Sequence, residues 1–359
     1  NALFITQISV FAQQPTPPRK TLSLPNGAKP IPKGRYQPNW DSIKKNYKTP
    51  SWFLEAKFGR NEKTVDELKR LAANLEKAIS LDPKFTLAYV ELAQNYNLLG
   101  TFMGQKPEYY QQKASLTLKK ALDLDPNLSE AHTVLAKMKM DFEHDWAGCE
   151  REFKRAIEIN PNNELAHHWY GEVYLSAMNR IEESLTELEI SHRLNPLSSG
   201  IVTALAWSYI GKKDYQKAIV LCDQAHQLNP TDNDVYHYRA QALFKLNRFE
   251  EAVQQMDEAI KIDGETTRYF ALKAVFLASD GKRDEAAKIL NELKHKSVSR
   301  YSLAIVENAI GNRDQAFELL NQELQTESVD LLSIEIDPLL DSMRDDVRFK
   351  ELEGKLKFP

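Results

Sequence analysis

The residues best placed for chemistry are the adjacent His167 and His168, with Glu164 and Glu172 four residues on either side of His168. On a helix, neighbouring side chains point about 100° apart, so the two rings cannot share one ligand. No second histidine follows at the four-residue spacing of a helical zinc site, and the chain contains neither His-Glu-x-x-His nor a glycine-rich phosphate loop. We therefore predict a solvated or core histidine at each position, and neither a metal nor another cofactor.

The other reactive side chains are scattered. Serines, histidines and aspartates have no spacing that would place a nucleophile, a base and an orienting group together, so we predict that the protein is not an enzyme. The two cysteines, Cys149 and Cys222, fall at apolar helix positions far apart along the chain. We expect both to be buried and too distant for a disulfide.

The composition is that of an ordered globular or solenoid chain. Of the 359 residues, 27% are charged and 42% are hydrophobic, and the formal net charge is −4. Disordered chains are less apolar, and nucleic-acid-binding proteins usually carry a basic patch or stripe. We therefore expect no nucleic-acid partner.

The elements that position these residues repeat. When residues 200–293 are shifted by 34, apolar and small residues coincide, and this period predicts two-helix repeats that must stack to bury their apolar faces. The coinciding sets are Val202, Tyr236 and Phe270; Ala206, Ala240 and Ala274; Tyr209, Leu243 and Leu277; Ala218, Ala252 and Ala286; and Cys222, Met256 and Leu290.

An acidic residue or asparagine followed by proline ends a helix repeatedly, at Asp82-Pro83, Asp125-Pro126, Asn160-Pro161, Asn195-Pro196 and Asn229-Pro230. The first full unit has an insertion at 101–109, and the next two are about one residue longer at the turn between their helices. We predict an array over 61–330 and a capping segment over 331–359.

The N-terminal part differs from the array. Residues 1–12 form an apolar run that is too short for a membrane span and ends in Val10-Phe11-Ala12, as at a signal-peptidase site, so we expect the end of a secretory signal whose basic start is missing. Residues 13–60 hold many prolines and are expected to be an extended arm. The protein is then secreted or periplasmic, or cytoplasmic if the run is not a signal.

Two family resemblances follow from these segments. Runs starting at Trp40 (Trp-Asp-Ser-Ile), Pro50 (Pro-Ser-Trp-Phe) and Ala56 (Ala-Lys-Phe-Gly) make residues 34–59 similar to the start of the alpha-L-fucosidase family, although no catalytic barrel follows. From residue 62, phrases such as Ala166-His-His-Trp-Tyr-Gly171 and Arg344-Asp-Asp-Val-Arg-Phe349 resemble the tetratricopeptide half of bacterial multidomain regulators. That resemblance implies an all-α right-handed solenoid of about six to seven helical hairpins.

In tetratricopeptide arrays the first helix of each hairpin lines a concave groove. We predict that this groove binds a protein or peptide, with Trp207 and Phe244 as apolar anchors if they are not packed between hairpins. The residues expected in the groove are Val90, Gln94, Lys137, His168, Glu172, Trp207, Ile210, His237, Gln241 and Phe244.

Several alternatives stay open. The array could be the sensor half of a signalling or transcriptional regulator, or an accessory module of a fucosidase-like glycoside hydrolase. The proline-rich arm could fold back and occupy the groove with residues such as Trp52 and Phe53. Self-association is a further open partner, and no segment predicts a membrane span.

Overall fold

The computed structural model describes residues 65–102, 107–263, 266–325, 331, 334–335 and 337–356, and in these ranges it contains helices and no strand. The elements, in chain order, are α4 (Val65–Leu81), α5 (Thr86–Phe102), α6 (Pro107–Leu124), α7 (Ser129–Met138), η2 (Lys139–Glu143), α8 (Trp146–Ile159), α9 (Glu164–Trp169), η3 (Tyr170–Leu175), α10 (Ile181–Leu194), α11 (Ser199–Gly211), α12 (Tyr215–Leu228), α13 (Asn233–Lys245), α14 (Phe249–Asp263), α15 (Thr267–Ser279), α16 (Arg283–Leu293), α17 (Arg300–Ile310), α18 (Arg313–Leu324), η5 (Pro338–Met343) and α19 (Val347–Lys355).

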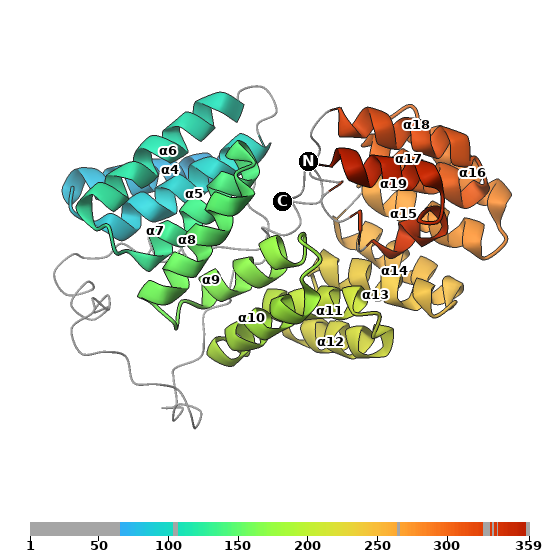
Figure 1. Ribbon diagram of the computed structural model, residues 1–359, viewed down its shortest axis with the longest axis horizontal. Coiled ribbons are helices and arrows are strands. Elements are labelled where there is room, and N and C mark those ends of the chain that lie inside the picture. Colours follow the sequence, from blue (N-terminus) through green and yellow to red (C-terminus); the bar gives the residue numbers. More distant parts are fainter. Residues whose placement is uncertain are drawn as a thin grey trace.

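From α5 onward the helices pair into seven successive hairpins, α5 with α6 through α17 with α18. Figure 1 shows the hairpins stacked side by side along an open arc, from α4 and α5 at one end, through α11 and α12, to α17 and α18 at the other. Each hairpin packs on the next, because no single hairpin can bury its own apolar face. The predicted solenoid of helical hairpins is confirmed.

The helix ends fall where the sequence predicted them, one residue before each Asp-Pro or Asn-Pro pair. After α4, for example, the Asp82 side chain accepts a hydrogen bond from the backbone N–H of Lys84 at 3.0 Å. The same turn recurs at Asp125 (3.0 Å), Asn160 (3.1 Å) and Asn229 (3.2 Å). These short polar side chains satisfy the backbone of a turn, while proline prevents the helix from continuing.

In the six hairpins from α7–α8 to α17–α18, the turn between the two helices uses a left-handed residue. The residues with positive φ are His144, Asn179, Lys213, Asn247, Gly281 and Gly311, with φ of 49°, 53°, 67°, 59°, 82° and 105°. Asn179, Lys213, Asn247 and Gly281 are each 34 residues apart in sequence. Lys213 is the unusual member, because among residues other than glycine it is mainly asparagine, aspartate and histidine that adopt a positive φ.

The second and third full hairpins carry their extra residue inside a helix. Pro126, Pro161 and Pro196 are each 35 residues apart, whereas Pro196 and Pro230 are 34 apart. We expected the additional residue at the turn between the helices. It lies instead in the last part of the first helix, which becomes the π-helices η2 and η3. A π-helix absorbs one residue without breaking the helix.

The insertion predicted at 101–109 is likewise shared with the helices, because α5 ends at Phe102 and α6 begins at Pro107. Both are longer than the other hairpin helices, with 17 and 18 residues. The extra length of the first full hairpin therefore extends its helices and does not form a loop throughout.

The apolar core consists of two clusters, one from Leu68 to Leu175 and one from Leu185 to Leu352. Between them lies a chain of three buried hydroxyls, which we call the serine seam: Ser184 Oγ is 3.1 Å from Ser176 Oγ and 2.9 Å from Ser208 Oγ. Both cysteines are free and buried, as predicted.

The C-terminal segment does more than cap the array. Arg348 pairs with Asp314 and covers the Phe317 ring at 4.1 Å, so α19 closes the outer face of α18. Upstream, η5 reaches back across the last hairpins, where Asp341 pairs with Lys245 at the end of α13. Leu339, Leu340, Met343, Phe349 and Leu352 are buried there. The segment thus fastens the last three hairpins to one another.

Candidate peptide-binding groove

The first helices of the hairpins lie on the inner side of the arc. Each packs directly on the first helix of a neighbouring hairpin, as α5 does on α7, α7 on α9 and α11 on α13, whereas the second helices contact chiefly the hairpin that follows. Helices that approach their equivalents most closely lie on the short side of a curved stack. The predicted groove residues are therefore on the inner helices.

Equivalent positions of four successive inner helices form a row that we call the inner column: Lys137, Glu172, Trp207 and Gln241. Their exposed fractions are 4%, 4%, 7% and 2%, so all four are buried. One helical turn earlier, His168 and His237 are buried as well. Of the other predicted groove residues, Val90 and Ile210 are buried, and Gln94 and Phe244 are partly buried. Their role in binding stays a prediction.

Lys137 is held by its own helix. Its Nζ lies 2.6 Å from both carboxylate oxygens of Asp141, which also accepts a hydrogen bond from Asn97 at 3.3 Å. The π-helix η2 carries Asp141, so the pair spans the junction of α7 and η2. The Asp141 carboxylate thus neutralises the charge of Lys137 at this end of the inner column.

His168 and Glu172 pair across the junction of α9 and η3. His168 Nε2 lies 3.0 Å from Glu172 Oε2, close enough for an ion pair although without hydrogen-bond geometry. Complete burial opposes the charged imidazole, yet the carboxylate of Glu172 raises the pKa of His168 above its ordinary value. Both adjacent histidines are thus core residues, one of the two outcomes that the sequence predicted.

A second polar group lies two hairpins further on, along α13. Arg268 Nη2 lies 2.8 Å from His237 Nδ1, and burial together with this guanidinium lowers the pKa of His237 well below its ordinary value. The imidazole is therefore neutral. Asp232 caps α13, and burial, with a contribution from Glu172, raises its pKa to about 6.

The aromatic anchors pack between hairpins. The ring of Trp207 stacks on Tyr238 with centroids 5.1 Å apart, and Phe244 lies 5.3 Å from Phe276. Tyr238 also contacts His237 at 4.9 Å. Trp207 is therefore packed at the junction between α11 and α13. This is the alternative to the exposed anchor that the sequence left open.

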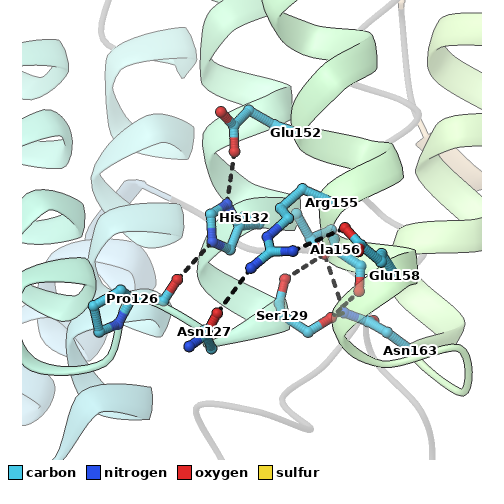
Figure 2. A network of polar contacts seen from close by, with 10 residues as sticks. Pro126, Asn127, Ser129, His132, Glu152, Arg155, Ala156, Glu158 and Asn163 are labelled. Atoms are coloured by element: carbon cyan, nitrogen blue, oxygen red, sulfur yellow. Dashed lines mark hydrogen bonds and ion pairs between the residues drawn. The ribbon is translucent and has the colours of Figure 1, made fainter.

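A recurring clamp that the sequence did not reveal holds the inner helices to their hairpin partners, and Figure 2 shows one example. His132 lies with Nδ1 2.6 Å from Glu152 Oε2 on the second helix and Nε2 3.0 Å from the Pro126 carbonyl oxygen (Figure 2). His167 repeats the clamp with Glu187 and Pro161, at 2.5 and 3.0 Å. The hydrogen bond to the Glu152 carboxylate raises the pKa of His132 above its ordinary value.

In two other hairpins a tyrosine takes the histidine's place. The hydroxyls of Tyr89 and Tyr236 donate to the carbonyls of Pro83 and Pro230, at 3.2 and 3.0 Å. The signal in the sequence is a histidine or tyrosine six residues after the proline. The clamp ties the two helices of one hairpin to the turn that precedes them, and we assign it no chemistry.

Within the described residues, no group of three or more histidine, cysteine, aspartate or glutamate side chains is arranged to hold a metal ion. Over the same ranges, no helix combines the length and the apolar character needed to cross a bilayer.

The comparison with protein-family models matches residues 209–276 to the tetratricopeptide repeat. These residues run from α11 to α15, the strictly periodic part of the array. Residues 209–276 are thus similar to the tetratricopeptide repeat, and the hairpins on either side share their two-helix architecture. Among curated proteins, anaphase-promoting complex subunit 3 of Schizosaccharomyces pombe is 26% identical over 161 residues, which is 44% of this chain and 24% of that protein. The match thus spans about a quarter of the relative's length.

Solved structures of similar shape share the fold at low sequence identity. The anaphase-promoting-complex assembly Cut9–Hcn1 has a TM-score of 0.61 and 12% identity, over 88% of this repeat protein and 57% of that chain. PilW, a type IV pilus biogenesis factor, has a TM-score of 0.51 and 14% identity, over 59% and 93%. A tetratricopeptide repeat protein from Parabacteroides merdae ATCC 43184 has a TM-score of 0.50 and 14% identity, over 76% and 98%.

These similarities establish the solenoid fold. They do not identify a binding partner of this chain. None of them supports the predicted resemblance to multidomain regulators or the resemblance of residues 34–59 to alpha-L-fucosidases. Residues 34–59, the predicted signal remnant and the proline-rich arm lie outside the described residues. Those assignments stay predictions.

Proposed function

We propose that this repeat protein is a non-enzymatic scaffold that binds an extended peptide segment of another protein along the inner column. The fold supports a role in protein–protein interaction, because stacked hairpins present a long continuous inner surface. The polar residues of the inner column support a peptide as the bound segment.

The observation that carries the proposal is the polarity of the inner column. Lys137, Glu172 and Gln241 are buried at a position that the next hairpin fills with the apolar Val275. Burying a charged or amide side chain is unfavourable unless its polar atoms find partners, as Lys137 does with Asp141 and Glu172 with His168. Stacking alone would favour apolar residues at all of these positions, as at Val275. Polar side chains repeated along one row favour a binding role.

The test is a synthetic peptide array probed with the full-length protein, followed by fluorescence polarisation on the peptides that bind. Because Trp207 is buried and stacked, Trp207→Ala is expected to lower stability by about 3–5 kcal/mol as well as binding. Trp207→Phe keeps a ring on Tyr238, so it isolates the indole's contribution to binding.

We expect Trp207→Phe to weaken peptide binding several-fold while the melting temperature changes little. The matched control is Trp146→Phe, the same substitution at the start of the outer helix α8, which should leave peptide affinity unchanged. An equal loss in both variants, or full affinity in Trp207→Phe, would contradict binding along the inner column.

A further inference from the structure

Part of the C-terminal segment lies along the inner helices of the last three hairpins. Residues 337–343, which we call the cis segment, consist of Asp337 and the 3₁₀ helix η5. The cis segment contacts α13 and α17, and the charge of Arg268, on α15, acts on Asp337. All three helices are the first, inner helices of their hairpins. The cis segment therefore lies on the concave side of the arc.

Polar contacts hold both ends of the cis segment. At its start, the hydroxyl of Tyr301, near the beginning of α17, donates a hydrogen bond to Asp337. At its end, Nζ of Lys245, the last residue of α13, lies 2.5 Å from Asp341 Oδ2. The cis segment thus runs along the inner helices, from the start of one to the end of another, as an extended ligand in a groove would.

The residues that hold the cis segment share a helix face with the inner column. Ile305 follows a buried alanine of α17 just as Gln241 follows one of α13, so Ile305 is the equivalent position in the last hairpin. Tyr301 lies four residues before Ile305, and Lys245 lies four residues after Gln241. Residues four apart lie on one face of a helix. The cis segment therefore occupies the groove positions of these repeats.

The charges of the groove and of the cis segment are opposite. Burial opposes the charged form of Asp341, yet Lys245 and Arg344 hold its pKa below the ordinary value, so this carboxylate is ionised at neutral pH. Burial raises the pKa of Asp337, and the charge of Arg268 opposes that rise. An acidic segment thus lies against a basic part of the groove, which is the complementarity expected of a recognised ligand.

Between its two carboxylates the cis segment is apolar. Leu339 and Leu340 are 6% and 0% exposed, and they belong to the same apolar cluster as Val275 and Ile305. The inner column is polar at Gln241 and becomes apolar at Val275 and Ile305, in the hairpins along which the cis segment runs. The composition of the groove therefore follows its occupant.

We propose that the inner face of α13, α15 and α17 is a binding site for an acidic segment with leucines between its carboxylates, and that the protein's own cis segment fills it. A partner with this pattern must displace the cis segment, so the contact is autoinhibitory. A tethered segment acts at an effective concentration of roughly 1 mM, which keeps the site closed. The site begins where the inner column ends, so either proposal can fail without the other.

The test is fluorescence polarisation of a labelled peptide of residues 337–346 with the full-length protein and two charge-reversal variants. Asp341→Lys weakens the cis segment and leaves the groove intact, so this variant should bind the native peptide at least about tenfold more tightly than the native protein does. Lys245→Asp reverses the charge of the groove. It should therefore bind a peptide that carries Asp341→Lys at least about fivefold more tightly than the native peptide.

The matched control is Asp345→Lys, the same change at an exposed residue just after the cis segment, which should bind the native peptide no better than the native protein does. If both reversal variants fold and bind neither peptide, the cis segment is only a structural cap and the proposal is overturned. Equal affinity of the native protein and Asp341→Lys would overturn it as well, because the site would then not be closed. So would loss of folding in both variants, because the cis segment would then be indispensable to the core.

Discussion

Replacing Ser184 by alanine would remove the middle hydroxyl of the serine seam that joins the two apolar clusters. Ser184 is the hydrogen-bond partner that the described structure gives the Ser208 hydroxyl, at 2.9 Å, and all three seam residues are fully or almost fully buried. The next hairpin carries alanine at both equivalent positions, Ala218 and Ala242, which are also buried. The chain therefore contains its own apolar version of the seam.

The expected effects follow from which hydroxyls lose a partner. Ser184→Ala leaves Ser208 unsatisfied and should cost about 1–3 kcal/mol, while Ser208→Ala leaves Ser184 bonded to Ser176 and should cost about 1 kcal/mol or less. The double variant recreates the Ala218 and Ala242 pair and should be near neutral. The coupling between the two sites is then about 1–4 kcal/mol, well above the scatter of additive pairs.

The assay is hydrogen exchange of α10 and α11 in the four proteins of this double-mutant cycle, because unfolding of repeat arrays need not be a single two-state step. The reciprocal control, Ala218→Ser, places a hydroxyl in an apolar junction and should destabilise. If the costs of Ser184→Ala and Ser208→Ala simply add, the hydroxyls are not mutually dependent and the seam is not a unit.

Two further predictions concern the turns and the clamp. Lys213→Gly should raise the free energy of unfolding by about 0.5–1 kcal/mol, because Lys213 has a φ of 67°, which glycine adopts more easily. Gly281→Ala should lower it by a similar amount, because φ is 82° there. The loss is purely conformational, since no atom lies within 4 Å of the added Cβ. Thermal unfolding checks both, and shifts in the same direction would contradict the argument. The hydrogen bond that His132 donates to Glu152 raises the pKa of His132. This pair's contribution to stability is therefore present below about pH 6.5 and is lost as the pH rises through the folded-state pKa. The stability difference between the native protein and Glu152→Gln should shrink with rising pH, and a constant difference would refute the charged clamp.

The periodic part of the fold was predictable because its causes are local. Stacked hairpins need small residues where helices cross, so Ala218, Ala252 and Ala286 recur at a fixed spacing. Helix ends were equally readable, since a proline stops a helix and the preceding Asp or Asn closes the turn.

The π-helices were not predictable in this way. Counting residues between Pro126 and Pro161 reveals one extra residue, but the count does not tell whether a loop or a helix takes it. That choice depends on packing: η3 lies against α10 and α11, and this contact holds the helix intact around the additional residue.

Of the candidate site, the sequence predicted the register but not the burial. The spacing identified Glu172, Trp207 and Gln241 as equivalent positions of inner helices. Whether such a position is exposed depends on what packs upon it, as Tyr238 does on Trp207. The His132 clamp was missed because its glutamate comes from another helix and its carbonyl from a turn.

The additional residue in η2 and η3 has a consequence for protein engineering. Each π-helix shifts the phase of the residues after it, so these two hairpins are interchangeable with each other but out of register with the five others. A consensus hairpin averaged over all seven would delete the shift and turn the residues after it to a different face of the helix. Hairpins moved between arrays should therefore be exchanged by class, with the 35-residue and 34-residue units kept apart.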